Sequence, residues 1–494
     1  MVSDIDEYID YCREKFKSFN LIEFFRHFKF GDQVNAESTF QRCIGLIRRS
    51  DDKAFSDWAH NVSEDDFHLF KRTDVKDYWR NLSVDEAERD AKASGEVYAL
   101  NEVTLKFKKA TSAPKRRRSG SSSYIEEVKN DELLLRSPRP ENRWIIDDND
   151  ISQKFFNLQV KAAKYVNDDA KDDLVLEECL FELMSLQNIL LLKPYQNNQV
   201  MLDVFGAEML NTMHKSRMDV WTNGCPSFST QEIESIQVII DDYQFKKVSL
   251  NVAVFKLCSL TLKMDNIKTS VVNCIRRLME KLPMREPIER CTSETEVWSA
   301  YVDPVLDSLL SSPEEGVHLR WTNQKDIQEK GERPDGIVSI MSQSQWSRNF
   351  GHGEAKIAEA TENYYVLAWD LCRLGYFNKN IINKDNVKSS FAFQSKGHSV
   401  TFYITELAFD GIYVMAELNS IQIPKSVNTL ETLITRRSLM YLMQVAHVFD
   451  KIKKEKKNTS QEFSSMKRIE PSLKQLEALV SEKKDRRRNS SVRF

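Results

Sequence analysis

Residues 333–357 constrain the fold of this chain most, because two short apolar runs alternate there with turn-forming polar residues. The first run reads Arg-Pro-Asp-Gly-Ile-Val-Ser-Ile (333–340), and the second reads Gly-Glu-Ala-Lys-Ile (353–357). Asp335 opens the first run and precedes Glu354 by 19 positions. That separation fits a strand, a loop and a second strand. The pattern therefore predicts two neighbouring strands.

The charged residues of these strands suggest a metal site. Residues two apart on a strand project from the same face, so Glu354 and Lys356 are expected to lie together, and pairing of the strands would add Asp335. Carboxylate oxygens are ligands for a hard cation such as Mg²⁺. Such a cation polarises a phosphoryl oxygen and lowers the pKa of a bound water, while a lysine stabilises developing charge. The trio therefore predicts phosphodiester hydrolysis.

Pro334-Asp335 and Glu354-Ala355-Lys356 resemble the two halves of the signature of the PD-(D/E)xK nuclease superfamily, which includes restriction endonucleases. The resemblance covers about residues 291–455. It implies that Asp335 and Glu354 bind Mg²⁺, with Mn²⁺ able to substitute, that the Ala355 carbonyl assists, and that Lys356 is the catalytic lysine. It also implies an endonuclease acting on nucleic acid, with DNA favoured over RNA. Many members act as dimers to cut both strands, so a homodimer is one expectation.

The order of elements around the motif agrees with this resemblance. A helix over 294–310 precedes three strands, at 317–321 and the two motif strands, and a helix follows over 358–374. Strands are then predicted at 390–394, 399–407 and 412–418, followed by a helix over 428–454. The family core has the order α-β-β-β-α-β. We therefore expect an α+β chain, with helical N-terminal and middle regions before a restriction-endonuclease-like core whose mixed sheet is flanked by helices.

Several other residues are candidates for the site. Many family members carry another carboxylate on the first helix, which makes Glu296 a candidate metal ligand and Glu294 a second choice; both also suit a helix start, where they offset the dipole. His352 could meet a phosphate, although a lone loop histidine is more often structural. Polar residues of the next helix could support the site, and none stands out among Glu359, Thr361, Tyr364 and Tyr365.

Composition limits the other function classes. The chain has 494 residues and a formal net charge of −3, so no global positive field indicates nucleic acid binding. Its eight cysteines include no Cys-x-x-Cys pair, which argues against a zinc module and for reduced thiols. The acidic N-terminus does not resemble a secretory signal, and no stretch reaches about 18 uncharged apolar residues, so we expect a soluble, intracellular protein.

The first 290 residues are expected to be mainly helical. Residues 1–104 combine helical spacing of apolar residues with many aromatics, and Ser83 to Glu86 form a capping-box pattern. Residues 140–290 contain several amphipathic segments, for which a helical bundle is the economical interpretation. Neither region assembles a recognisable site. They are predicted to bind protein partners or to position substrate.

Two basic segments lie outside these regions, one between them and one after residue 455. Residues 105–139 form a linker whose Pro-Lys-Arg-Arg-Arg cluster (114–118) and following serines predict disorder. The cluster resembles a nuclear localisation signal, and Ser119 fits a basic-directed kinase; a solvated charge run explains it equally well. Residues 456–494 are predicted to be a basic, mobile tail able to hold phosphates non-specifically. The nucleus is therefore the expected location, with the cytoplasm as the alternative.

A second function class stays open beside the nuclease. A catalytically inactive protein with the same fold would bind nucleic acid or protein without turnover, and the lack of a basic stripe within 291–455 favours it. Binding that ignores Mg²⁺ would distinguish it from the enzyme. A zinc-dependent hydrolase is a weaker third idea, because the histidines lack metal-ligand spacing.

Overall fold

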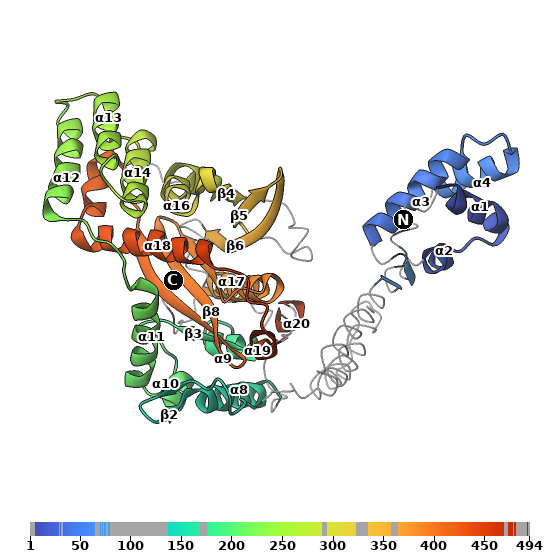
Figure 1. The fold of residues 1–494 in the computed structure, drawn as a ribbon, viewed down its shortest axis with the longest axis horizontal. Helices are drawn as coiled ribbons and strands as arrows, with labels where there is room; N and C mark the ends of the chain where they lie inside the picture. Colours follow the sequence, from blue (N-terminus) through green and yellow to red (C-terminus); the bar gives the residue numbers. More distant parts are fainter. Residues whose placement is uncertain are drawn as a thin grey trace. The chain divides into compact units, whose positions relative to one another are not determined.

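The computed structural model describes most of the chain in two compact units, Met1–Leu134 and Leu135–Phe494 (Figure 1). The residues described are 5–28, 30, 33–64, 70, 72, 74–75, 78–79, 137–167, 175–288, 294–322, 334–356, 364–468, 473–477, 479–480 and 492. The capping box predicted at 83–86 and the basic cluster at 114–118 lie outside these residues.

The first unit contains four described helices around an aromatic core. They are α1 (Ile5–Lys15), α2 (Leu21–His27), α3 (Gln33–Ile47) and α4 (Lys53–Glu64). Asn20 begins α2, because its side chain accepts hydrogen bonds from the amides of Ile22 and Glu23. Large aromatic side chains are fully buried between the helices, namely Phe24, Phe25, Phe40 and Phe55. The predicted helical character of this region is confirmed.

The second unit is built on a mixed sheet of seven strands in the order β3-β9-β8-β7-β6-β5-β4. The strands are β3 (Ile189–Leu192), β4 (Val317–Trp321), β5 (Gly336–Ser342), β6 (Gln345–Lys356), β7 (Ser389–Lys396), β8 (Ser399–Phe409) and β9 (Ile412–Gln422). Neighbours are antiparallel except for the pairs β6–β7 and β3–β9, which are parallel.

The parallel pair β6–β7 requires a crossover, and the helix α17 (Tyr364–Asp385) lies between these strands in the chain. The helix α16 (Asp303–Leu310) precedes β4. The predicted order of helix, three strands, helix and strand is therefore confirmed, as is the mixed sheet flanked by helices. The three strands predicted after α17 are also present, as β7, β8 and β9.

Helices lie on both faces of the sheet (Figure 1), and a hydrophobic cluster fills the space between the helices and the sheet on each face. Phe391 and Phe393 of β7 pack into the cluster that contains α16, α14 (Asn266–Lys281) and α18 (Arg436–Lys454). Ala392, between them, packs into the cluster that contains α17. This alternation follows from the two-residue period of a strand. Both faces of the central strands are buried, and polar side chains placed there require partners within the protein.

The prediction of an all-helical region over 140–290 is wrong at Ile189–Leu192, which form β3 and extend the sheet beside β9. The run Ile-Leu-Leu-Leu is apolar throughout, as expected for a strand buried on both faces. A short hairpin, β1 (Ile145–Ile146) with β2 (Asn149–Asp150), also lies in this region. The remaining helices are α8 (Ile151–Asn167), α9 (Leu180–Leu186), α10 (Gln199–Phe205), α11 (Ala207–Thr222), α12 (Thr230–Gln244) and α13 (Leu250–Thr261).

The C-terminal segment also differs from its prediction as a mobile tail. Its described parts include α19 (Gln461–Met466) and α20 (Leu473–Glu477). Phe463, Leu473 and Leu476 are buried in the hydrophobic cluster on the α17 face. The prediction was based on the many lysines and arginines of this segment, and the few apolar residues among them are too widely spaced to show a pattern. The arginines at 486–488 lie outside the described residues.

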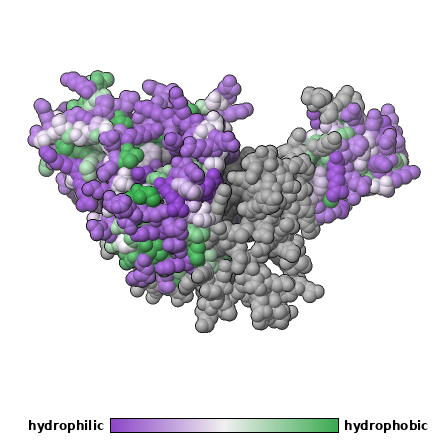
Figure 2. All heavy atoms as spheres, turned by 60° about the horizontal axis from the view of Figure 1, so that its bottom comes forward, coloured by the Kyte–Doolittle hydropathy of each residue, from purple (hydrophilic) through white to green (hydrophobic). Residues whose placement is uncertain are grey.

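The visible surface of the larger unit is mainly hydrophilic, with hydrophobic residues interspersed (Figure 2). Several of the exposed apolar side chains belong to α12, α13 and their ends, including Val238, Phe255 and Leu262. Among the helices that the structure describes, none combines the length and the apolar character required to cross a membrane.

Candidate functional site

The pairing of β5 with β6 brings Asp335 and Glu354 together. The strands are antiparallel, and Gly336 is opposite Gly353, so Asp335 just before β5 lies at the end of β6 that carries Glu354. The carboxylate of Asp335 accepts a hydrogen bond of 2.9 Å from the amide of Ala355. This bond fixes the aspartate against the neighbouring strand.

Lys356 completes the predicted trio from the same strand. Its Nζ lies 3.5 Å from Oδ2 of Asp335 and donates a hydrogen bond of 3.2 Å to the Ala355 carbonyl. The lysine and Asp335 side chains retain 18% and 25% of their exposure, so this end of the cluster is open to solvent. The structure therefore brings Asp335, Glu354, Ala355 and Lys356 together, as predicted.

Glu354 lies at the buried end of the cluster. Its side chain is 0% exposed, and Nη1 of Arg373 on α17 lies 3.0 Å from its Oε1. Within the described part of the chain, neither carboxylate oxygen of Glu354 has a hydrogen-bond partner. Burial, followed by the negative charges of Asp370 and Asp335, raises the pKa of Glu354 well above its usual range. Buried carboxylates are normally hydrogen-bonded, so the oxygens of Glu354 could accept a further ligand such as an ion or a water.

Asp370 and Arg373 belong to the site and were missed in the sequence. Asp370 lies 3.3 Å from Nζ of Lys356 and 3.5 Å from Nη1 of Arg373. Burial raises the pKa of Asp370 from 3.8 to about 6, against the opposing effect of Lys356 and Arg373. These two residues are the only charged ones in the otherwise apolar run 364–377. Two charged residues one helical turn apart in an apolar helix could have indicated that both lie in a buried polar site.

The other residues proposed for the site are Glu296 and four polar residues of the predicted helix after β6. Glu296 lies on the short helix α15 (Glu294–Val297) with an exposed side chain, and the additional carboxylate beside Lys356 is that of Asp370. A metal role for Glu296 remains a prediction. Tyr364 and Tyr365 lie at the start of α17, whereas Glu359 and Thr361 lie outside the described residues.

His352 is buried in the sheet, two residues before Glu354 and on the same face. Its ring centroid lies 5.2 Å from that of Phe377 on α17. A packing role therefore fits it better than contact with a phosphate. On the opposite face of β6, Gly353 leaves room for the ring of Phe393, because a Cβ at this glycine would lie 2.0 Å from the ring. The close packing of Phe393 on Gly353 thus leaves the other face of β6, which carries Glu354, directed toward α17.

The residues present fit a Mg²⁺ ion. This ion commonly uses one or two protein carboxylates and keeps several waters or takes substrate phosphate oxygens as further ligands. Asp335 at the solvent side and Glu354, whose buried oxygens lack hydrogen bonds, supply such a pair. No group of three or more His, Cys, Asp or Glu side chains in the described ranges could hold a metal by itself. A site of two carboxylates therefore requires water or phosphate as additional ligands.

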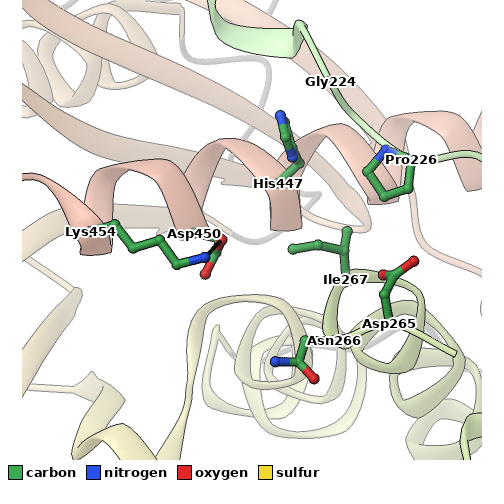
Figure 3. Close-up of a pocket in the computed structure, with 8 residues that line it drawn as sticks. All are labelled: Gly224, Pro226, Asp265, Asn266, Ile267, His447, Asp450 and Lys454. Atoms are coloured by element: carbon green, nitrogen blue, oxygen red, sulfur yellow. Dashed lines mark hydrogen bonds and ion pairs between the residues drawn. The ribbon is translucent and has the colours of Figure 1, made fainter.

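A surface pocket elsewhere shares no residue with this cluster. It has a volume of about 520 Å³ and lies between the start of α14 and one side of α18 (Figure 3). His447, Asp450 and Lys454 line it from α18, and Lys454 pairs with Asp450 at 2.6 Å. Asp265 also lines it, and its side chain is used to begin α14. These local interactions account for the charged groups Asp450, Lys454 and Asp265.

Comparisons of the chain with protein-family models, curated proteins and solved structures find no match. The motif, the order of the elements and the geometry of the cluster are the features that indicate a function.

Proposed function

We propose that this protein is a metal-dependent nuclease that hydrolyses phosphodiester bonds, in DNA rather than RNA. One observation carries the proposal. The buried carboxylate of Glu354, without hydrogen bonds in the described part, lies in one cluster with Asp335 and Lys356 at the ends of two paired strands. A divalent cation would satisfy its oxygens.

Each residue of the cluster has a role in this proposal. Asp335 and Glu354 would hold the cation, with help from the Ala355 carbonyl, and the bound cation would polarise a phosphoryl oxygen and acidify water. Lys356, partly exposed and 3.5 Å from Asp335, would orient the attacking water and stabilise charge that develops on the phosphate. Asp370 holds the lysine at 3.3 Å from the buried side, which limits its range of orientations.

DNA as substrate and the nucleus as location are inferred from the basic cluster at 114–118, which resembles a nuclear localisation signal. The arginines at 486–488 would add non-specific attraction to phosphates, and this attraction would weaken strongly with salt. The helices of the first unit would position substrate or bind a protein partner, and a homodimer would place two sites on opposite strands.

A binding protein without turnover is the second candidate, and the Arg373–Glu354 pair favours it. The guanidinium lies 3.0 Å from Glu354, so a cation of the protein itself already neutralises one predicted metal ligand. Such a protein would bind nucleic acid equally well in EDTA and in Mg²⁺. The nuclease requires the metal for cleavage.

Cleavage of several nucleic acids tests the proposal and identifies the substrate class. Supercoiled plasmid, linear duplex, single-stranded DNA and RNA would be incubated with the full chain in Mg²⁺, Mn²⁺ or EDTA. Asp335→Ala and Lys356→Ala would run beside the wild type, with Lys425→Ala as an exposed-lysine control. Cutting that requires metal, Asp335 and Lys356 supports the nuclease. A folded wild type that cuts none of these substrates would contradict it and favour the binding protein.

A further inference from the structure

Among the described residues, the cluster holds more acidic than basic side chains. Its ion-paired members are three carboxyl groups, Asp335, Glu354 and Asp370, and two cations, Lys356 and Arg373. A fully buried carboxylate is costly unless a cation lies beside it. Arg373 supplies that charge to Glu354 from α17, at 3.0 Å.

Arg373 also has a second carboxylate within reach on its own helix. Its Nη1 lies 3.5 Å from Oδ1 of Asp370, one turn earlier on α17. The guanidinium carbon lies 5.5 Å from the ring centroid of Phe377, and the side chain retains 20% of its exposure. A small rotation of the guanidinium would therefore exchange Glu354 for Asp370 and keep the arginine paired.

The contact with Glu354 is an ion pair without a well-aligned hydrogen bond, since both Glu354 oxygens lack hydrogen bonds in the described part of the chain. A bidentate arginine–carboxylate pair would hold the two side chains firmly. The observed arrangement leaves the carboxylate oxygens available to a ligand that coordinates them more directly.

We propose that Arg373 is the counterion of Glu354 in the metal-free protein and gives up this position to a divalent cation, pairing with Asp370 when the cation binds. This inference rests on the proposed function, because it takes Asp335 and Glu354 as the metal ligands. Arg373 is then a positioning residue that sets metal affinity without touching the substrate.

The exchange has a defined thermodynamic consequence. A cation that displaces Arg373 must replace a favourable interaction, so the arginine stabilises the metal-free protein and weakens metal binding. Its removal should lower the stability of the metal-free protein and increase the stabilisation that metal provides. An arginine that serves only in packing would alter stability equally with and without metal.

The experiment measures thermal unfolding of the full chain in EDTA and in Mn²⁺, with the dissociation constant of Mn²⁺ from calorimetry. The variants are Arg373→Gln, Arg373→Lys and Asp335→Asn. Arg217→Gln is the matched control, because Arg217 pairs with Glu406 at 3.5 Å in the same unit and its side chain is similarly buried, at 18% exposure. Arg373→Lys retains the charge and serves if the glutamine variant does not fold.

Arg373→Gln should lower the unfolding midpoint in EDTA, show a larger rise with Mn²⁺ than the wild type, and bind Mn²⁺ about 10-fold more tightly. Arg373→Lys should give values between those of the wild type and Arg373→Gln. Arg217→Gln should leave the rise of the unfolding midpoint with Mn²⁺ unchanged. Equal or weaker Mn²⁺ binding by Arg373→Gln, with the rise abolished in Asp335→Asn, would overturn the exchange alone. A rise that persists in Asp335→Asn, or is absent from every protein, would overturn the metal site itself.

Discussion

The carboxylate of Asp335 accepts a hydrogen bond of 2.9 Å from the main-chain amide of Ala355, across the pairing of β5 with β6. This bond orients one proposed metal ligand from the strand that carries the other. An aspartate held by a backbone amide cannot turn freely, so its position is fixed before any ligand arrives. Asp335 thus has two functions, accepting this hydrogen bond and supplying a negative charge. An asparagine would separate them, because its amide oxygen accepts the same bond without the charge.

Asp335→Asn should therefore preserve the fold and remove activity. The asparagine oxygen can still accept from Ala355, so the free energy of unfolding in EDTA should change by less than about 1 kcal/mol. Cleavage should fall by roughly 100-fold or more, because the charge of a metal ligand is lost. Denaturant unfolding and initial cleavage rates measure the two effects. A stable Asp335→Asn variant with wild-type cleavage would exclude Asp335 as a ligand.

Gly353→Ala should destabilise the second unit by about 1–3 kcal/mol. An added Cβ would lie 2.0 Å from the ring of Phe393, which is fully buried in the sheet. Gly45→Ala is the control, because a Cβ at Gly45 meets nothing within 4 Å in α3, where alanine favours the helix.

A double-mutant cycle tests the cause of that destabilisation. Phe393→Leu removes ring atoms opposite the glycine, so Gly353→Ala should cost less in the leucine background than in the wild type. Denaturant unfolding of the four proteins gives the coupling. Additive effects of the two substitutions would show that the ring is not what the glycine accommodates.

Ionisation of Asp370 should lower the free energy of unfolding of the metal-free protein as pH rises from about 4 to 6. The pKa of this carboxyl is about 6 in the folded protein against 3.8 ordinarily, so the folded state binds more protons within this window. The stabilising contribution is complete below the lower value and is lost as pH passes the higher one. For one buried carboxyl the change is roughly 3 kcal/mol.

Asp370→Asn should remove this component, so the difference in unfolding free energy between wild type and variant should change across the window. Measurements in EDTA at a series of pH values between about 4 and 7 isolate the effect, because other groups titrate in both proteins. Parallel pH profiles for the two proteins would show that Asp370 does not have the raised pKa.

Lys193→Met should cost about 3–5 kcal/mol, because it leaves a buried charge without its partner. Lys193 follows β3, with its side chain only 1% exposed, and pairs with Glu417 of β9 at 2.7 Å while donating a hydrogen bond to Tyr403. Adding Glu417→Gln should recover part of the loss. Chemical denaturation measures both variants. A loss below about 1 kcal/mol for Lys193→Met would mean that the pair does not anchor β3 to the sheet.

Elements that are determined by neighbouring residues in the chain could be predicted from the sequence. The strands β4, β7, β8 and β9 follow from alternation and turn residues, and the side chains of Ser229 and Glu232 form a capping box that begins α12. β3 was missed because a four-residue apolar run is ambiguous until its neighbour β9, more than two hundred positions later, is known. The two-residue period of a strand predicted that Glu354 and Lys356 lie together, and Asp335 joins them because β5 pairs with β6.

Asp370 and Arg373 could not be placed by the same reasoning. Their position depends on how α17 packs across the parallel strands β6 and β7, which is a tertiary relationship. The aromatic and aliphatic residues around them indicated a buried helix face, and a charged pair inside such a face requires partners. The chain supplies those partners from β6.

The most direct test of the account is the single-turnover rate of DNA cleavage in Mg²⁺ by wild type and by Lys356→Ala, each shown to be folded. The wild type should cleave DNA only with metal, and the rate of the variant should be at least about 100-fold lower, because Lys356 is the residue assigned to the developing charge. Equal rates for the two proteins would contradict the assignment of Asp335, Glu354 and Lys356 as the catalytic site.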